Sequence, residues 1–191
     1  MKELIFATGN AHKVQEASHI IGLRAPGVSV LPYAGDSPAE TGTSFLENAR
    51  IKSMAAFHAT GKPSFADDSG ICVDVMGGAP GIFSAVWSGT RSDVSNRDLL
   101  LAQLRDIPEE HRQASFVCTI SLVAEDVDVS FTGVWPGHIS FESRGTAGFG
   151  YDPIFVPEGF QLTAAELEPD LKNLISHRAM AMSELAMFLA Q

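Results

Sequence analysis

The stretch "SFADDSGICVDVMGGAPGIFS", residues 64–84, places two aspartates side by side within otherwise apolar sequence. "PSFA" precedes the pair and "ICVDV" follows it, which predicts strand material on either side of an acidic turn, "DDSG". Adjacent carboxylates repel each other, and a partly buried pair needs a counter-charge or must keep one proton. A divalent cation would supply that charge. For "DDSG" alone an ordinary surface turn, which needs no counter-charge, is the favoured interpretation. The apolar sequence on both sides shifts the balance toward a cation site, because it places the turn at the end of core strands.

The sequence before this stretch alternates between strand and helix patterns. "ELIFA" predicts a first strand and "AHKVQEASHIIG" a helix that stops at Gly22, and "VSVLPY" predicts a second strand. A longer helix is expected from about Ser44 to Thr60, because Ser44 and Glu47 have the spacing of a capping box. "GKP", residues 61–63, should end that helix.

The sequence after residue 84 adds a hairpin and further helices. "SNRDLLLAQLRD" is helical in pattern, "RQASFVCTISLVAED" alternates as a strand does, and "VDVSFTGVWPGHISF" is expected to return as its antiparallel partner. A helical stripe near the end, typical of core packing, contains Ile175, Ala179, Met182, Ala186 and Leu189. With no repeat or linker, residues 1–191 are expected to form one α/β domain with a mixed central sheet flanked by helices.

Composition excludes several classes of protein. A hydrophobic content of 45% is typical of a globular chain, and a net charge of −10 argues against a nucleic-acid partner. The first apolar run is too short for a signal peptide, and no run is long enough for a membrane helix. We therefore expect a cytoplasmic protein with no membrane partner. Cys72 and Cys118 lie in apolar runs and are expected to be buried thiols rather than a disulfide.

Two segments in the first half could bind a metal-bound polyphosphate. "ATGNAHK" predicts a strand, a glycine turn and a helix, which would point free N–H groups and the helix dipole at one place, with Lys13 adding a full charge. The same pattern also occurs in ordinary connections. Glu40, Asp67 and Asp68 offer the hard oxygen ligands that suit Mg²⁺.

Two segments in the second half could bind a base. "GTAGFGYDPIFVPEGF", residues 145–160, offers the aromatic faces of Phe149 and Tyr151 and an acceptor at Asp152, although a glycine-rich turn over core aromatics would have the same pattern. In "LKNLISHRAM", a helix capped by Ser176 would hold His177 and Arg178 in its first turn. A cation there opposes the helix dipole unless an anion or an electron-rich ligand group shares the site, which favours ligand binding.

These pieces, in this order, resemble the inosine triphosphate pyrophosphatase family, the bacterial dITP/XTP pyrophosphatases also called Ham1-like proteins. The matching motifs are "TGNAHK", "ETGTSFLENARIKS", "ADDSGICVDVMGGAPGIFSA", "RQASFVC", "GFGYDPIF" and "KNLISHR", which span residues 8–178. The resemblance implies two lobes around a nucleotide cleft and a homodimer. It also implies hydrolysis of noncanonical purine nucleoside triphosphates (ITP, dITP, XTP) to the monophosphate and pyrophosphate with Mg²⁺.

The resemblance also implies roles for individual residues. Asp68 would be the catalytic proton acceptor, and the metal ligands would be Glu40 and Asp68, with Asp67 as a further candidate. Substrate contacts would come from Thr8, Gly9, Asn10, Ala11, His12, Lys13, Lys52, Ser69 and Lys172. Residues Phe149, Gly150, Tyr151 and Asp152 would hold the base, and His177 and Arg178 would face its six-position oxygen.

The chain departs from the pattern of its relatives at a few positions. Val86 stands where many relatives have Arg, Phe83 where Tyr is common, and Glu40 is the only acidic residue in "AETG".

The main alternative function is that of a nucleotide-binding regulator that does not hydrolyse its ligand. A dinucleotide-dependent oxidoreductase is disfavoured because the first turn lacks GxGxxG, and a Nudix-type enzyme because the chain has no acidic helix of that type.

Overall fold

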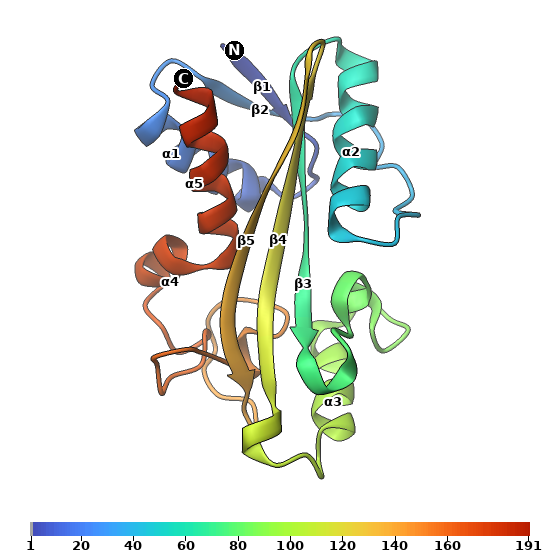
Figure 1. The fold of residues 1–191 in the computed structure, drawn as a ribbon, viewed down its shortest axis with the longest axis vertical. Coiled ribbons are helices and arrows are strands. Elements are labelled where there is room, and N and C mark those ends of the chain that lie inside the picture. Colours follow the sequence, from blue (N-terminus) through green and yellow to red (C-terminus); the bar gives the residue numbers. More distant parts are fainter. Residues whose placement is uncertain (1) are drawn as a thin grey trace. The chain divides into compact units, whose positions relative to one another are not determined.

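A computed structural model describes residues 2–191, apart from the side chain of His12, as a mixed α/β fold (Figure 1). One sheet has the strand order β2-β1-β3-β4-β5-β6. Its strands are β1 (Glu3–Phe6), β2 (Ser29–Pro32), β3 (Ser64–Val73), β4 (Gln113–Ala124), β5 (Val127–Ile139) and β6 (Phe155–Pro157). Strand β1 runs parallel to β2 and β3, and β5 runs antiparallel to β6. The predicted mixed sheet is confirmed.

Five α-helices accompany the sheet in the described residues: α1 (Ala11–Arg24), α2 (Phe45–Thr60), α3 (Asp93–Gln103), α4 (Pro169–Ile175) and α5 (His177–Leu189). Short 3₁₀ segments cover Asp74–Met76, Gly81–Val86, Glu109–His111 and Asp152–Ile154. The capping-box prediction for α2 is confirmed. Ser44 Oγ accepts from Glu47 N at 3.2 Å, and Gly61 ends the helix in the left-handed region at φ 64°.

The chain divides into two compact units, and β3, β4 and β5 contribute residues to both. The first unit contains the chain up to Asp68, Cys118–Gly133 and Arg178–Gln191, and the second contains Ser69–Val117 and Val134–His177. Among the described residues, no helix has both the length and the apolar character that crossing a membrane requires.

In the first unit, helices cover both faces of the sheet (Figure 1). Cys118, Ile120 and Leu122 of β4 pack in one buried cluster with residues of α1 and α5, as their alternation predicted. On the opposite face, Ser121 of β4 shares a buried hydrogen bond of 3.0 Å with Ser53 of α2. Successive residues of a strand in this unit therefore meet different helices.

The second unit has its own core, built around aromatic side chains. Phe116, Trp135 and Phe155 pack together with Leu100 of α3 and Ile154. The fully buried guanidinium of Arg112 donates to the carbonyl oxygens of Leu104, Ile107, Ile139 and Ser140. These hydrogen bonds join the end of α3 to the end of β5, and backbone carbonyls satisfy the buried guanidinium in place of a carboxylate.

The structure corrects three local predictions. Asp67 and Asp68 lie within the continuous strand β3 and not in a turn, because each carboxylate finds a cation on its own face of the sheet. Helix α1 continues past Gly22 to Arg24, because Ile21 and Ala25 are both buried and keep the helical hydrogen bond between them. Ile175 belongs to α4 and packs in the second unit, so it is not part of the stripe that continues on α5.

Candidate functional site

The turn between β1 and α1 is organised by its own side chains. Thr8 Oγ1 accepts from Asn10 N at 3.2 Å, and Asn10 Oδ1 accepts from Lys13 N at 3.4 Å. Asn10 thereby caps α1, and the helix begins at Ala11, directly after Gly9 and Asn10. The phosphate-binding role predicted for residues 8–13 stays a prediction, and for His12 it concerns a side chain outside the described part of the structure.

Asp67 is the centre of a buried ion network in the first unit. Lys13 Nζ donates to both its oxygens, at 2.8 and 3.0 Å, and Arg178 Nε donates to Oδ2 at 3.3 Å. Asp67 is 3% exposed and Arg178 7% exposed. Burial alone would raise the pKa of Asp67, but the charges of Lys13 and Arg178 outweigh it and hold that pKa well below its usual value.

This network explains the cation at the start of α5. Arg178 is in the first turn of the helix, as predicted, and the anion that offsets the unfavourable dipole is Asp67 of the protein itself. The pKa of Arg178 is raised, because the attraction of Asp67 outweighs the cost of burial. Arg178 therefore has a structural partner, and its predicted contact with a base stays a prediction.

Asp68 faces the other side of β3 and meets a different set of groups. Lys52 Nζ of α2 lies 2.6 Å from Glu40 Oε1 and 3.5 Å from Asp68 Oδ1. Burial raises the pKa of Asp68 above its usual value, and although Lys52 opposes the rise, the neighbouring charge of Glu40 adds to it. The pKa of Lys52 is raised, because Asp68 and Glu40 overcome the effect of its burial. The Lys52 ammonium therefore links Glu40 and Asp68, the two residues predicted to bind the metal.

Asn48 belongs to the same group and was missed in the sequence. It is buried, its Nδ2 donates to Asp68 Oδ2 at 3.2 Å, and its Oδ1 accepts from Gly42 N at 2.9 Å. Asn48 therefore ties the loop that carries Glu40 to the side chain of Asp68. Its position one residue after the capping-box glutamate was the available signal, since that places it on the first turn of α2 beside the loop.

The donor set fits a magnesium ion that is shared with substrate. Among the described side chains, no group of three or more His, Cys, Asp or Glu is arranged to hold a metal ion. Mg²⁺ usually takes one or two carboxylates together with substrate phosphates and water, and Glu40 and Asp68 can provide the two carboxylates. Asp67 is the weaker candidate, because both of its oxygens already accept from Lys13.

In the second unit, the segment 148–152, "GFGYD", is held by residues from several elements. Asp152 Oδ2 accepts from Phe149 N at 2.8 Å and from Lys172 Nζ of α4 at 2.5 Å. Tyr151 is buried, and its hydroxyl donates to Ser84 O at 2.8 Å. Phe149 is 59% exposed as a residue, and the Lys172 ammonium lies over its ring, 5.6 Å from the centroid. This arrangement leaves an accessible aromatic face.

The remaining predicted site residues occupy distinct surroundings. His177 begins α5 and stacks on the ring of Phe116, with centroids 4.8 Å apart and an interplanar angle of 9°, beside Trp135. Phe116 and Trp135 were not predicted as its neighbours, because both are distant in sequence. Ser69 directly follows Asp68 in β3 and is half-buried. Phe83 and Val86, the positions at which the chain departs from its relatives, are both exposed.

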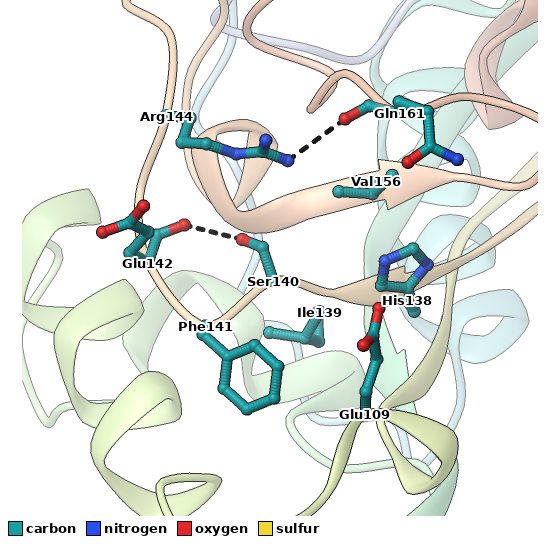
Figure 2. A pocket seen from close by; sticks show the side chains of 9 residues that line it. All are labelled: Glu109, His138, Ile139, Ser140, Phe141, Glu142, Arg144, Val156 and Gln161. Carbon is teal, nitrogen blue, oxygen red and sulfur yellow. Dashed lines mark hydrogen bonds between the residues drawn. The ribbon is translucent and has the colours of Figure 1, made fainter.

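A pocket in the second unit contains none of these residues. Figure 2 shows its lining, which is Glu109, His138, Ile139, Ser140, Phe141, Glu142, Arg144, Val156 and Gln161. Arg144 donates to the carbonyl oxygen of Gln161, and Ser140 donates to that of Glu142. These polar groups satisfy the local backbone, so the pocket does not resemble a built ligand site.

Comparison with known proteins identifies the family of this chain. The Ham1 family model matches residues 4–188. The dITP/XTP pyrophosphatase of Leifsonia xyli subsp. xyli is 49% identical over 97% of this chain and 94% of its own, and that of Streptomyces avermitilis is 50% identical over 97% and 96%. A solved HAM1 protein from Coxiella burnetii, 38% identical, superposes with a TM-score of 0.92 over 99% of this chain and 98% of its own. The chain belongs to the Ham1 family.

Proposed function

We propose that this chain is a nucleoside triphosphate pyrophosphohydrolase that removes noncanonical purine nucleotides, with ITP, dITP and XTP as substrates. Two of its close relatives have the name dITP/XTP pyrophosphatase and match almost the whole chain. The observation that carries the proposal is the convergence of Glu40 and Asp68 on Lys52 Nζ, at 2.6 and 3.5 Å. An enzyme that binds a metal-bound polyphosphate needs both signs of charge in one place.

The proposed reaction is attack of water on the α-phosphorus. The water oxygen forms a bond to phosphorus, the bond between the α-phosphorus and the bridging oxygen breaks, and pyrophosphate leaves with the monophosphate as the second product. Asp68 accepts the proton of the water. Its place supports that role, because Asn48 orients one carboxylate oxygen, and Lys52 and Glu40, which would contact the phosphates and the metal, lie beside it.

Other residues of the first unit would bind the triphosphate. Lys52 would neutralise phosphate oxygens, and the N-terminus of α1 with residues 8–13 would supply N–H groups. Mg²⁺, held by Glu40 and Asp68, would add charge neutralisation on the phosphates. Asn48 would keep Asp68 in its orientation through the hydrogen bond at 3.2 Å.

Residues of the second unit would bind the base. The exposed Phe149 ring offers a stacking surface, and Lys172 and Asp152 lie next to it. His177 and Arg178 would donate to the six-position oxygen. ATP has an amino group there, and an unpaired buried donor costs about 1–3 kcal/mol, so each lost hydrogen bond would disfavour ATP roughly fivefold or more.

The test is a substrate panel of dITP, XTP, ITP, ATP and GTP with and without Mg²⁺. Release of pyrophosphate and monophosphate from dITP and XTP, dependent on Mg²⁺, is the expected result. Release of orthophosphate and a nucleoside diphosphate would show a different reaction. Saturable binding of dITP without turnover would favour the non-catalytic regulator. We also propose a homodimer, which the family resemblance implies, and a cytoplasmic location, which the short apolar runs of the sequence favour. Light scattering on the purified chain tests the first of these.

A further inference from the structure

Two side chains of α3 hold both backbone polar groups of Gly150. Asp93 Oδ2 accepts from Gly150 N at 2.9 Å, and Arg97 Nη1 donates to Gly150 O at 3.1 Å. Asp93 and Arg97 are four residues apart, so they lie on the same face of the helix. Gly150 has φ 60° and open space where a Cβ would stand. Its backbone conformation, and not crowding, is what requires glycine.

Gly150 lies in the segment 148–152, between the exposed ring of Phe149 and the buried ring of Tyr151. The neighbouring residues have their own anchors, since Phe149 N donates to Asp152 Oδ2 and the Tyr151 hydroxyl donates to Ser84 O. Gly150 joins the two aromatic residues, and glycine has the most backbone freedom of any residue type. The two hydrogen bonds from α3 therefore fix the peptide groups on either side of it.

We propose that Asp93 and Arg97 are positioning residues for purine binding, which hold Gly150 so that the Phe149 ring is preformed for stacking. This inference rests on the proposed function and deepens it. Ordering a loop when ligand binds costs affinity, and a loop ordered in advance avoids that cost. Loss of either hydrogen bond would let the Gly150 peptide sample other conformations, and the ligand would have to restore the bound one. Affinity for the base would fall while the chemistry on the phosphates stayed the same.

The test compares Asp93→Ala and Arg97→Ala with the wild type on dITP. We expect the KM for dITP to rise about tenfold for each variant, with kcat within about twofold, because uniform binding energy is lost. The inhibition constant of inorganic tripolyphosphate should not change, because that ligand has no base. Asp93→Asn keeps an oxygen acceptor, and Arg97→Lys keeps a charged donor, so both should recover part of the lost affinity. Asp98→Ala, at an exposed position of the same helix, is the matched control.

Several results would overturn the inference. An unchanged KM in both alanine variants would show that the hydrogen bonds do not serve binding. A parallel rise in the tripolyphosphate inhibition constant, or the same rise of KM in Asp98→Ala, would indicate a general structural defect. If the wild type released no pyrophosphate from dITP, the proposed function would fail. The positioning role would then be judged by the dissociation constants of dITP for the same variants, measured by calorimetry, where equal values would reject it.

Discussion

The neighbours Asp67 and Asp68 are predicted to respond in opposite ways to the same substitution. Asp67→Asn removes the anion shared by Lys13 and Arg178, and Arg178 is only 7% exposed. Breaking a buried ion pair by removing one partner costs about 3–5 kcal/mol. For a chain of this size, this loss corresponds to a fall in Tm of roughly 6–20 °C.

Asp68→Asn should leave Tm unchanged or slightly higher. The raised pKa of Asp68 means that the folded state disfavours its charged form, so neutralising it removes an unfavourable interaction. Turnover should fall by at least about 100-fold, the lower limit for loss of a general base. The assays are calorimetric unfolding and pyrophosphate release from dITP with Mg²⁺. An Asp68→Asn variant with near-normal kcat, or an Asp67→Asn variant as stable as the wild type, would refute this assignment of roles.

Three further predictions concern buried groups. Arg178→Ala should lower Tm more than His177→Ala, because loss of Arg178 leaves Asp67 with Lys13 as its only cation from this network. Both variants should also reduce the preference for dITP over ATP. An unchanged preference would contradict the role of these two residues at the base. The folded pKa of Asp67 is below its unfolded value, so its contribution to stability is complete above that unfolded value and is lost as the pH falls. The Tm difference between wild type and Asp67→Asn should therefore be constant from about pH 8 to 5 and shrink below about pH 4. Burial raises the pKa of Cys118 to about 12, so this thiol should not react with a thiol-specific disulfide reagent until the chain unfolds, and reaction in the native protein would disprove its burial.

Local patterns in the sequence predicted the elements whose signals are local. The alternation of Ala114, Phe116, Cys118, Ile120 and Leu122 predicted β4, because a strand with a buried face must alternate. The ends of α2 were predictable because Ser44 and Gly61 satisfy the helix termini with groups only a few residues away. Such features depend on neighbours in sequence, and the structure confirms them.

The partners of the site residues could not be predicted in the same way. Lys13 is 54 residues from Asp67, and Arg178 is 111 residues from it, so their meeting depends on the whole topology of the first unit. Asp93 and Arg97 carry no motif of their own, and their contact with Gly150 exists only once α3 packs in the second unit. Local propensity gave "DDSG" the character of a turn, whereas tertiary cations made it part of a strand.

The strand also answers why adjacent carboxylates are tolerated. Successive side chains of a strand point to opposite faces, so Asp67 and Asp68 have different cations as their nearest partners, although the charge of Asp67 also helps to raise the pKa of Asp68. Lys13 and Arg178 do most to lower the pKa of Asp67, whereas burial raises that of Asp68 and the charge of Glu40 adds to the rise. Environments that separate the pKa values of two carboxyl groups also separate their roles. Asp67 is thereby suited to remain a permanent anion that holds α1 and α5 to the sheet, and Asp68 to accept and release a proton.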